Sequence, residues 1–273
     1  MSDSHAVHPG TNVRVIWAIV RLATSALMAA AVVAQFVTTF TLTAEKGRDV
    51  ETTLVNFFSF FTILSSCLGV IVMLVGGLWL LTRGAKKQWE PRWMSYVWIS
   101  VGTYMVITGI VYNLLLRGYV LEQGATVVWA NEVLHLIGPI MFLLDLVLCI
   151  ARRPLGWTAM GVAVIFPIAW VIYTLVRGEN VTSPVTGDPY WYPYPFLNPY
   201  LQPNGYFGVG IYVIGIAAAI LMIAALAVWR TRVGRRADTT EEEPTDDVAV
   251  ETESQTEAEA APAAASPKPV KKR

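Results

Sequence analysis

The sequence has few charged residues, few histidines and few cysteines. Charged side chains make up 15% of its 273 residues, whereas an average soluble domain has roughly 25%. Hydrophobic residues make up 55% of the chain, and the mean hydropathy is +0.50. This composition argues against an ordinary soluble enzyme. It also argues against a nucleic-acid-binding protein, which needs a basic surface dense enough to neutralise several phosphates.

The two cysteines, Cys67 and Cys149, both lie in apolar stretches. They exclude a disulfide framework, and we interpret them as packing residues. The sequence also lacks a CxxC pair, a zinc-ligand spacing, a glycine-rich phosphate loop and a GxSxG motif. We therefore expect neither a metal nor a cofactor.

The formal net charge is zero, but the charge is unevenly distributed along the chain. Residues 237–273 carry ten acidic and four basic side chains, a net charge of −6, so the remainder carries +6. This segment is rich in Glu, Thr, Ala and Pro, and it has too little apolar surface to offset the entropy of ordering. We predict a disordered acidic tail on the cytoplasmic side.

Six stretches are apolar and long enough to cross the hydrocarbon core of a bilayer, which takes about 20 residues in a helix. They predict an all-α polytopic membrane protein, a bundle of six transmembrane helices. The expected organisation is a short N-terminal tail (1–11), a six-helix domain (12–236) and the acidic tail. The predicted spans are 13–37, 53–81, 93–116, 127–150, 155–176 and 206–230.

Lysine and arginine are more frequent in one set of connections than in the other. The connections 82–92, 151–154 and 231–236 contain nine of these residues. The connections 38–52, 117–126 and 177–205 contain four. Because cytoplasmic loops retain positive charge, we expect both termini in the cytoplasm, with an uncleaved first helix and a location in the plasma membrane.

Polar residues inside the spans are the candidates for function, because polarity is costly at membrane depth. Thr62 lies nine residues into the predicted second span, and His135 lies eight residues into the fourth. At about 1.5 Å per residue, both reach depths of roughly 12 to 13 Å from the same face. A hydroxyl and an imidazole at one level suggest a nucleophile and its general base.

Other interpretations of these residues stay open. Threonine commonly joins membrane helices by hydrogen bonds, and a buried histidine beside a carboxylate can be a proton relay or a structural group. Asn131 and Glu132 share the helix face of His135 and are candidates for fixing its tautomer. Glu132-x-x-His135 has the spacing of half a di-iron site, but no other span supplies a second histidine.

Two further features concern structure and access. We expect Asp145 to form an ion pair with Arg21, Arg152 or Arg153 in the inner half of the bilayer. The long connection before the last span contains prolines and aromatic residues, which suit either an interfacial belt or a lid over the Thr62 and His135 site. The candidate lid residues are Trp191, Tyr194, Pro195 and Phe196.

Three sequence blocks resemble those of the androgen-induced gene protein family of integral-membrane threonine hydrolases, in particular its bacterial six-helix branch. The resemblance covers about residues 12–236, and its blocks are Phe60 to Ile63, Asn131 to His135 followed by Pro139, and Trp191 to Asn198. It implies that Thr62 is the nucleophile and His135 its base. It also implies a substrate of the class cleaved by this family, the fatty acid esters of hydroxy fatty acids.

We therefore expect an intramembrane lipid-ester hydrolase whose partners are membrane lipid and an ester substrate. Asn131, Asn56 and Ser59 are the candidates for stabilising the oxyanion. One alternative is a small-molecule or proton-coupled transporter in which Glu132, His135, Asn113 and Arg21 line a polar path. Another is a noncatalytic membrane scaffold that recruits a partner through its tail.

Overall fold

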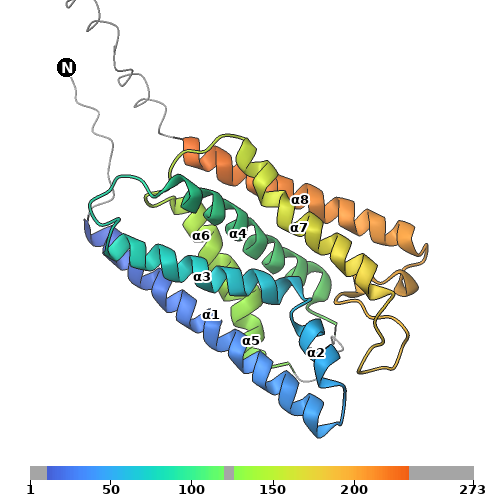
Figure 1. Ribbon diagram of the computed structural model, residues 1–273. Helices are drawn as coiled ribbons and strands as arrows, with labels where there is room; N and C mark the ends of the chain where they lie inside the picture. The colour runs from blue at the N-terminus through green and yellow to red at the C-terminus, as the bar shows by residue number, and fades with distance from the viewer. Residues whose placement is uncertain (1–10, 120–125, 234–273) are drawn as a thin grey trace, which may run out of the picture. The chain divides into compact units, whose positions relative to one another are not determined.

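The computed structural model describes residues 11–119 and 126–233 (Figure 1). Within these ranges the ordered elements are all helical, and six helices are long and apolar enough to cross a membrane. The predicted all-α bundle of six transmembrane helices is thus confirmed. Residues 1–10 of the predicted N-terminal tail, and the whole of the predicted acidic tail, lie outside the described residues.

Five of the six spans begin within a few residues of their predicted positions. Two spans contain a π-helical turn, Tyr112–Leu116 at the end of the third and Val133–Ile137 within the fourth. The helices are α1 (Thr11–Glu45), α2 (Val50–Phe57), α3 (Phe61–Leu81), α4 (Arg92–Val111), α5 (Val128–Glu132), α6 (Gly138–Leu148), α7 (Thr158–Gly178) and α8 (Tyr206–Arg232).

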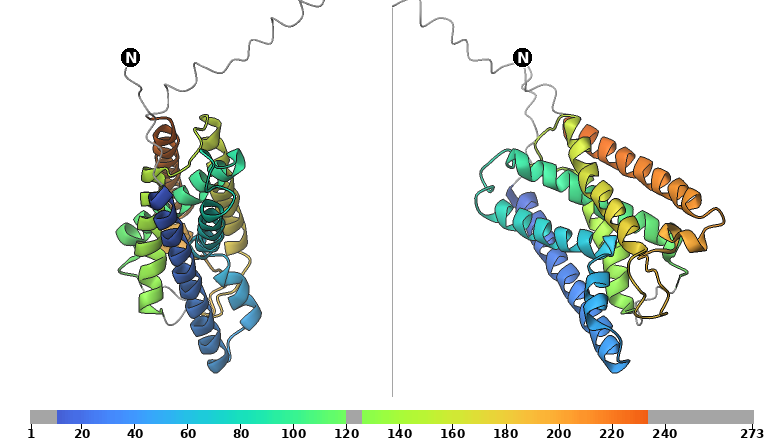
Figure 2. Two further views of the ribbon diagram at one scale, coloured as in Figure 1. Left: turned by 90° about the vertical axis from the view of Figure 1, so that its left-hand side faces the viewer. Right: turned by 45° about the vertical axis from the view of Figure 1, so that its right-hand side comes forward.

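Helix α4 is the centre of the bundle. It contacts α3 and α6 as well as α7 and α8, and it has the largest buried share of the six spans. Helices α1 and α3 pack along each other on one side of α4, and α7 and α8 form the other side (Figures 1 and 2). We call the end of the bundle where α1 begins and α8 ends the terminal end, and the opposite end the loop end.

The second span differs from its prediction. We expected one helix over 53–81, but α2 ends at Phe57 and the spanning helix α3 begins at Phe61. Ser59 interrupts the helix because its hydroxyl donates to the Val55 carbonyl at 2.7 Å. The Ser59 carbonyl, turned out of the helix, instead accepts from the Trp170 indole at 2.9 Å.

This break places Thr62 in the first turn of α3 rather than nine residues into a continuous helix. The first span also differs, because α1 continues to Glu45 rather than ending near residue 37. Its final turns contain threonines whose side chains are buried, and the Thr43 hydroxyl donates to the Thr39 carbonyl at 2.8 Å. Those turns remain helical because α2 and the loop end provide packing partners.

Helix α3 approaches both α4 and α1 closely because it carries a glycine at each contact, Gly76 facing Trp98 of α4 and Gly77 facing Leu22 of α1. A Cβ on Gly76 would lie 2.6 Å from the Trp98 ring, and a Cβ on Gly77 would lie 2.9 Å from the Leu22 side chain. Small residues allow this packing in a membrane, where close van der Waals contact replaces the hydrophobic effect between helices.

Replacement of Gly76 by alanine should therefore lower the thermal stability of the purified protein. Trp98 is fully buried and cannot move away from the new methyl group, and overpacking of this kind costs about 1 to 3 kcal/mol. Gly161→Ala in α7 is the matched control, because nothing lies within 4 Å of its Cβ position. Thermal unfolding in detergent should show a loss for Gly76→Ala alone, and equal midpoints for both variants would contradict this packing account.

Candidate functional site

Thr62 lies in the first turn of α3 and is held there by Tyr194. The Thr62 backbone N–H donates to the Tyr194 hydroxyl oxygen at 3.2 Å, and the two hydroxyl oxygens are also 3.2 Å apart. The first N–H groups of a helix have no partner within the helix, so Tyr194 satisfies one of them from a distant loop. Burial raises the pKa of Tyr194, which keeps its phenol protonated and able to donate a hydrogen bond.

Thr62 and Tyr194 border an apolar cavity of about 230 Å³. The cavity is enclosed by the beginning of α3, the end of α4, the middle of α7 and α8, and the loop before α8. Ile168, Ala217 and Leu221 line it and are also exposed on the surface of the bundle. The cavity therefore reaches the apolar surface that α7 and α8 present to the bilayer.

His135 lies in the π-helical turn of the fourth span. Its Nδ1 is 2.9 Å from the Asn131 carbonyl oxygen. A carbonyl can only accept, so Nδ1 carries the proton in the neutral ring and Nε2 is left as the basic nitrogen. The imidazole stacks on the Tyr112 ring with the ring centres 3.8 Å apart, and the Asn131 amide donates to the Tyr112 hydroxyl at 2.6 Å.

Tyr112 lies between the Thr62 cavity and His135. It lines the cavity that Thr62 borders, and its ring stacks on His135, which is not itself a lining residue. Among the described residues no hydrogen bond joins Thr62 to His135, since Thr62 is bonded to Tyr194 and His135 to Asn131. The nucleophile and base pair remains a prediction, with Tyr112 as a neighbour that sequence patterns did not reveal.

The predicted supporting residues have other partners. The Asn56 side-chain amide oxygen Oδ1 accepts from Arg177 at 2.8 Å, and the Ser59 hydroxyl is 2.9 Å from the Tyr173 hydroxyl. Glu132 pairs with Arg117 at 2.9 Å on the outside of the loop end. Asn131 supports His135 through its backbone carbonyl rather than through its side chain.

The loop before α8 contributes walls to two cavities. Tyr194 and Phe196 line the cavity of Thr62. Trp191, Tyr194 and Pro195 line a second cavity of about 210 Å³ at the loop end. All four candidate lid residues therefore border a cavity, and Tyr194 borders both.

Glu179 holds this loop in place, a role that sequence patterns did not indicate. Its carboxylate accepts from the hydroxyls of Tyr192 at 2.9 Å, Tyr200 at 2.8 Å and Tyr206 at 2.5 Å. The hydrogen bonds from Tyr206, Tyr200 and Tyr192 lower the pKa of Glu179. A single carboxylate thus ties the end of α7 to the loop and to the beginning of α8.

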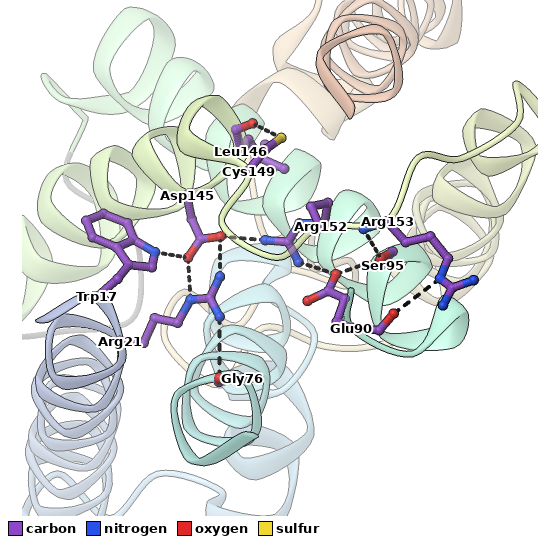
Figure 3. A network of polar contacts seen from close by, with 10 residues as sticks. All are labelled: Trp17, Arg21, Gly76, Glu90, Ser95, Asp145, Leu146, Cys149, Arg152 and Arg153. Atoms are coloured by element: carbon purple, nitrogen blue, oxygen red, sulfur yellow. Dashed lines mark hydrogen bonds and ion pairs between the residues drawn. The ribbon is translucent and has the colours of Figure 1, made fainter. Parts of the chain in front are cut away.

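A separate cluster of charged residues is buried at the terminal end (Figure 3). Asp145 of α6 accepts from Arg21 of α1 at 2.6 and 2.8 Å, and it also accepts from Trp17 at 2.8 Å. Arg152 bonds to Asp145 and to Glu90, the latter at 2.8 Å. The ion-pairing side chains of this cluster are at most 1% exposed.

The ionic groups of this cluster balance in charge. It contains two guanidinium groups and two carboxylates, and the Trp98 ring lies against both guanidinium groups, with its ring centre 4.4 Å from one and 4.3 Å from the other. Such balance is required, because burying an unpaired ion costs several kcal/mol. The expected pairing of Asp145 with Arg21 or Arg152 is confirmed. Arg153 instead donates to the Glu90 backbone carbonyl.

The turn after α6 brings Arg152 into this cluster. Cys149 and Ala151 have φ values of 52° and 58°, a left-handed conformation that non-glycine residues rarely adopt. The Ala151 carbonyl accepts from the Glu90 backbone N–H at 2.8 Å. The strained turn therefore joins the connection after α3 to the end of α6 and places Arg152 between its two carboxylate partners.

Comparisons with protein-family models, curated proteins and solved structures found no match to this chain. Within the described ranges, no group of three or more histidine, cysteine or acidic side chains has a geometry that could hold a metal ion. The fold and composition together define a multi-pass integral membrane protein.

Replacement of Asp145 by asparagine should destabilise the protein by about 3 to 5 kcal/mol, since it leaves two buried guanidinium groups facing a neutral amide. The control is Arg117→Gln, which breaks a partly exposed pair worth about 1 kcal/mol or less. Chemical denaturation in detergent should separate the two variants clearly. Equal losses would show that the buried cluster contributes no more than a surface pair.

Proposed function

We propose that the protein is an intramembrane lipid-ester hydrolase with Thr62 as its nucleophile, and that it belongs to the androgen-induced gene protein family. The observation that carries this proposal is the Thr62 hydroxyl at the edge of an apolar cavity that reaches the surface of the bundle. An apolar site that opens on this surface does not favour a water-soluble substrate. An acyl chain dissolved in the bilayer matches its apolar lining.

The acyl chain of the substrate enters between α7 and α8, past Ile168, Ala217 and Leu221. The Thr62 oxygen attacks the ester carbonyl carbon, and Nε2 of His135 accepts the hydroxyl proton. The ester C–O bond then breaks, and the alcohol leaves with that proton. Water attacks the acyl-threonine, again with His135 as base, and releases the fatty acid and the free Thr62 hydroxyl.

The first turn of α3 supports stabilisation of the oxyanion in this mechanism. The Tyr194 hydroxyl oxygen lies 3.2 Å from both the Thr62 backbone nitrogen and the Thr62 hydroxyl oxygen. Hydrogen-bond donors at a helix N-terminus favour developing negative charge. Tyr194, rather than Asn131, Asn56 or Ser59, is therefore our candidate for this role, because only Tyr194 among these four residues borders the Thr62 cavity.

Purified protein with Thr62→Ala or His135→Ala should lose hydrolysis of long-chain lipid esters. Thr62→Ser, which keeps a hydroxyl, should retain part of it. Tyr194→Phe removes only the phenol oxygen and should lower kcat about 100-fold, as expected for loss of one oxyanion donor. Release of free fatty acid is the measurement, with unchanged thermal unfolding as evidence of folding.

Thr103→Ala is the matched control, because Thr103 is fully buried in α4 but does not line the cavity. It should leave the rate of hydrolysis unchanged. Full activity of Thr62→Ala would refute the assignment of Thr62 as nucleophile, whatever the effect of Tyr194→Phe.

We further propose that the protein resides in the plasma membrane with both termini in the cytoplasm, since the basic connections cluster at the terminal end. The test uses cysteines introduced at two exposed positions, Lys86 and Thr186. A membrane-impermeant maleimide added to intact cells should label Thr186→Cys but not Lys86→Cys until the membrane is permeabilised. The opposite pattern would reverse the orientation.

A further inference from the structure

The second cavity, at the loop end, differs in chemistry from the cavity of Thr62. It lies among the final turns of α1, helix α2 and the loop before α8. Among the described residues that line it, Arg48 is the only charged one and none is acidic. Trp191, Tyr192 and Tyr119 provide aromatic walls. The cavity therefore combines one positive charge with an amphipathic surround.

Two hydrogen-bond donors at this cavity have no partner among the described residues. Asn56 is 5% exposed, and its side-chain Nδ2 makes no hydrogen bond. Arg177 donates to the other end of the amide group, the oxygen Oδ1. A buried amide nitrogen without a partner costs about 1 to 3 kcal/mol. The Arg48 guanidinium likewise has no carboxylate partner in the described part of the chain.

The nearest acidic residue in sequence does not neutralise Arg48. The Asp49 carboxylate caps α2 by accepting from the Glu51 backbone N–H at 3.0 Å, and it also accepts from the Thr52 hydroxyl. The hydrogen bond from Thr52 lowers the pKa of Asp49. The carboxylate is therefore ionised and engaged with α2. The free donors at this cavity are thus suited to an anion supplied from outside the chain.

The position of the cavity indicates where that anion comes from. Helix α1 has 35 residues and is about 52 Å long, which exceeds the roughly 30 Å of a hydrocarbon core. Its last turns, where Thr39 and Thr43 line the cavity, therefore project to the headgroup level. Tryptophan and tyrosine at the same cavity are typical of that level.

We propose that the loop-end cavity binds the anionic headgroup of a membrane lipid, a phosphate or a carboxylate, through Arg48 and the Asn56 amide. The headgroup oxygens accept from the guanidinium and from Nδ2, and the lipid chains remain in the bilayer beside α1 and α2. This site does not depend on the proposed ester hydrolysis. Loss of headgroup binding and loss of catalysis are separate outcomes.

The test measures thermal unfolding of the delipidated full-length protein in detergent, with four probes at matched concentrations. Phosphatidic acid and oleate carry both a chain and an anion, diacylglycerol carries chains alone, and inorganic phosphate carries the anion alone. A ligand that binds only the folded state raises the unfolding midpoint in proportion to its affinity. We expect a larger rise with phosphatidic acid, oleate or both than with diacylglycerol, whose chains can enter only the Thr62 cavity, and none with inorganic phosphate.

Arg48→Gln should weaken the lipid affinity about tenfold or more, since a charge-assisted pair of hydrogen bonds is lost. Lys46→Gln is the matched control. It removes the same charge only two residues from Arg48, and the Lys46 side chain does not line the cavity. Asn56→Asp should abolish binding, because it replaces the amide donor by a carboxylate that repels the anionic headgroup. Each variant without lipid should unfold close to the wild type.

The proposal is overturned if diacylglycerol or inorganic phosphate stabilises the wild type as well as the anionic lipids do, or if no probe stabilises it. It is also overturned if Lys46→Gln loses as much affinity as Arg48→Gln, since binding would then follow general surface charge. Where a variant unfolds early without lipid, native mass spectrometry of its lipid-bound fraction replaces the melting measurement.

Discussion

The carboxylate of Asp145 is the point at which much of the bundle is joined. It accepts hydrogen bonds from Trp17 and Arg21 of α1 and from Arg152 after α6. Arg21 also reaches the Gly76 carbonyl of α3. An unpaired carboxylate at this depth would be prohibitively costly. Because these donors satisfy the carboxylate, its charge links α1 to the end of α6 and, through Arg21, to α3.

The rest of the terminal end follows from satisfying that carboxylate. Two arginines paired with one aspartate leave an excess positive charge. Glu90, which lies in the connection after α3, neutralises it. The left-handed residues at Cys149 and Ala151 are the conformational cost of turning the chain so that Arg152 reaches both carboxylates. Position 76 is a glycine because Trp98, which lies against both guanidinium groups, occupies the space of a side chain there.

The sequence predicted the spans and the partner of Asp145 for a common physical reason. A bilayer admits only long apolar helices and paired charges, so length, hydropathy and the scarcity of ionisable groups restrict the possibilities strongly. Glu90 escaped prediction because it lies in a connection, where charge is ordinary. Tyr112 and Glu179 escaped because their roles depend on partners brought together only by tertiary packing.

The break between α2 and α3 could not be read from hydropathy, since the phenylalanine-rich segment around it is as apolar as a helix interior. It depends on Ser59 and on Trp170, which lie 111 residues apart. Likewise, the sequence placed Thr62 and Tyr194 in candidate roles but not in contact, because 132 residues separate them. The break and this contact give Thr62 its position at a helix N-terminus beside a cavity.

We propose that the Thr62 oxygen acts as a nucleophile inside the membrane. The most direct measurement is to treat the wild-type protein with a fluorophosphonate probe, digest it and locate the adduct by mass spectrometry. The account predicts a covalent adduct on Thr62 that forms more slowly when a long-chain ester is present. An adduct on a different residue, or complete loss of ester hydrolysis while Thr62 stays unmodified, would contradict it.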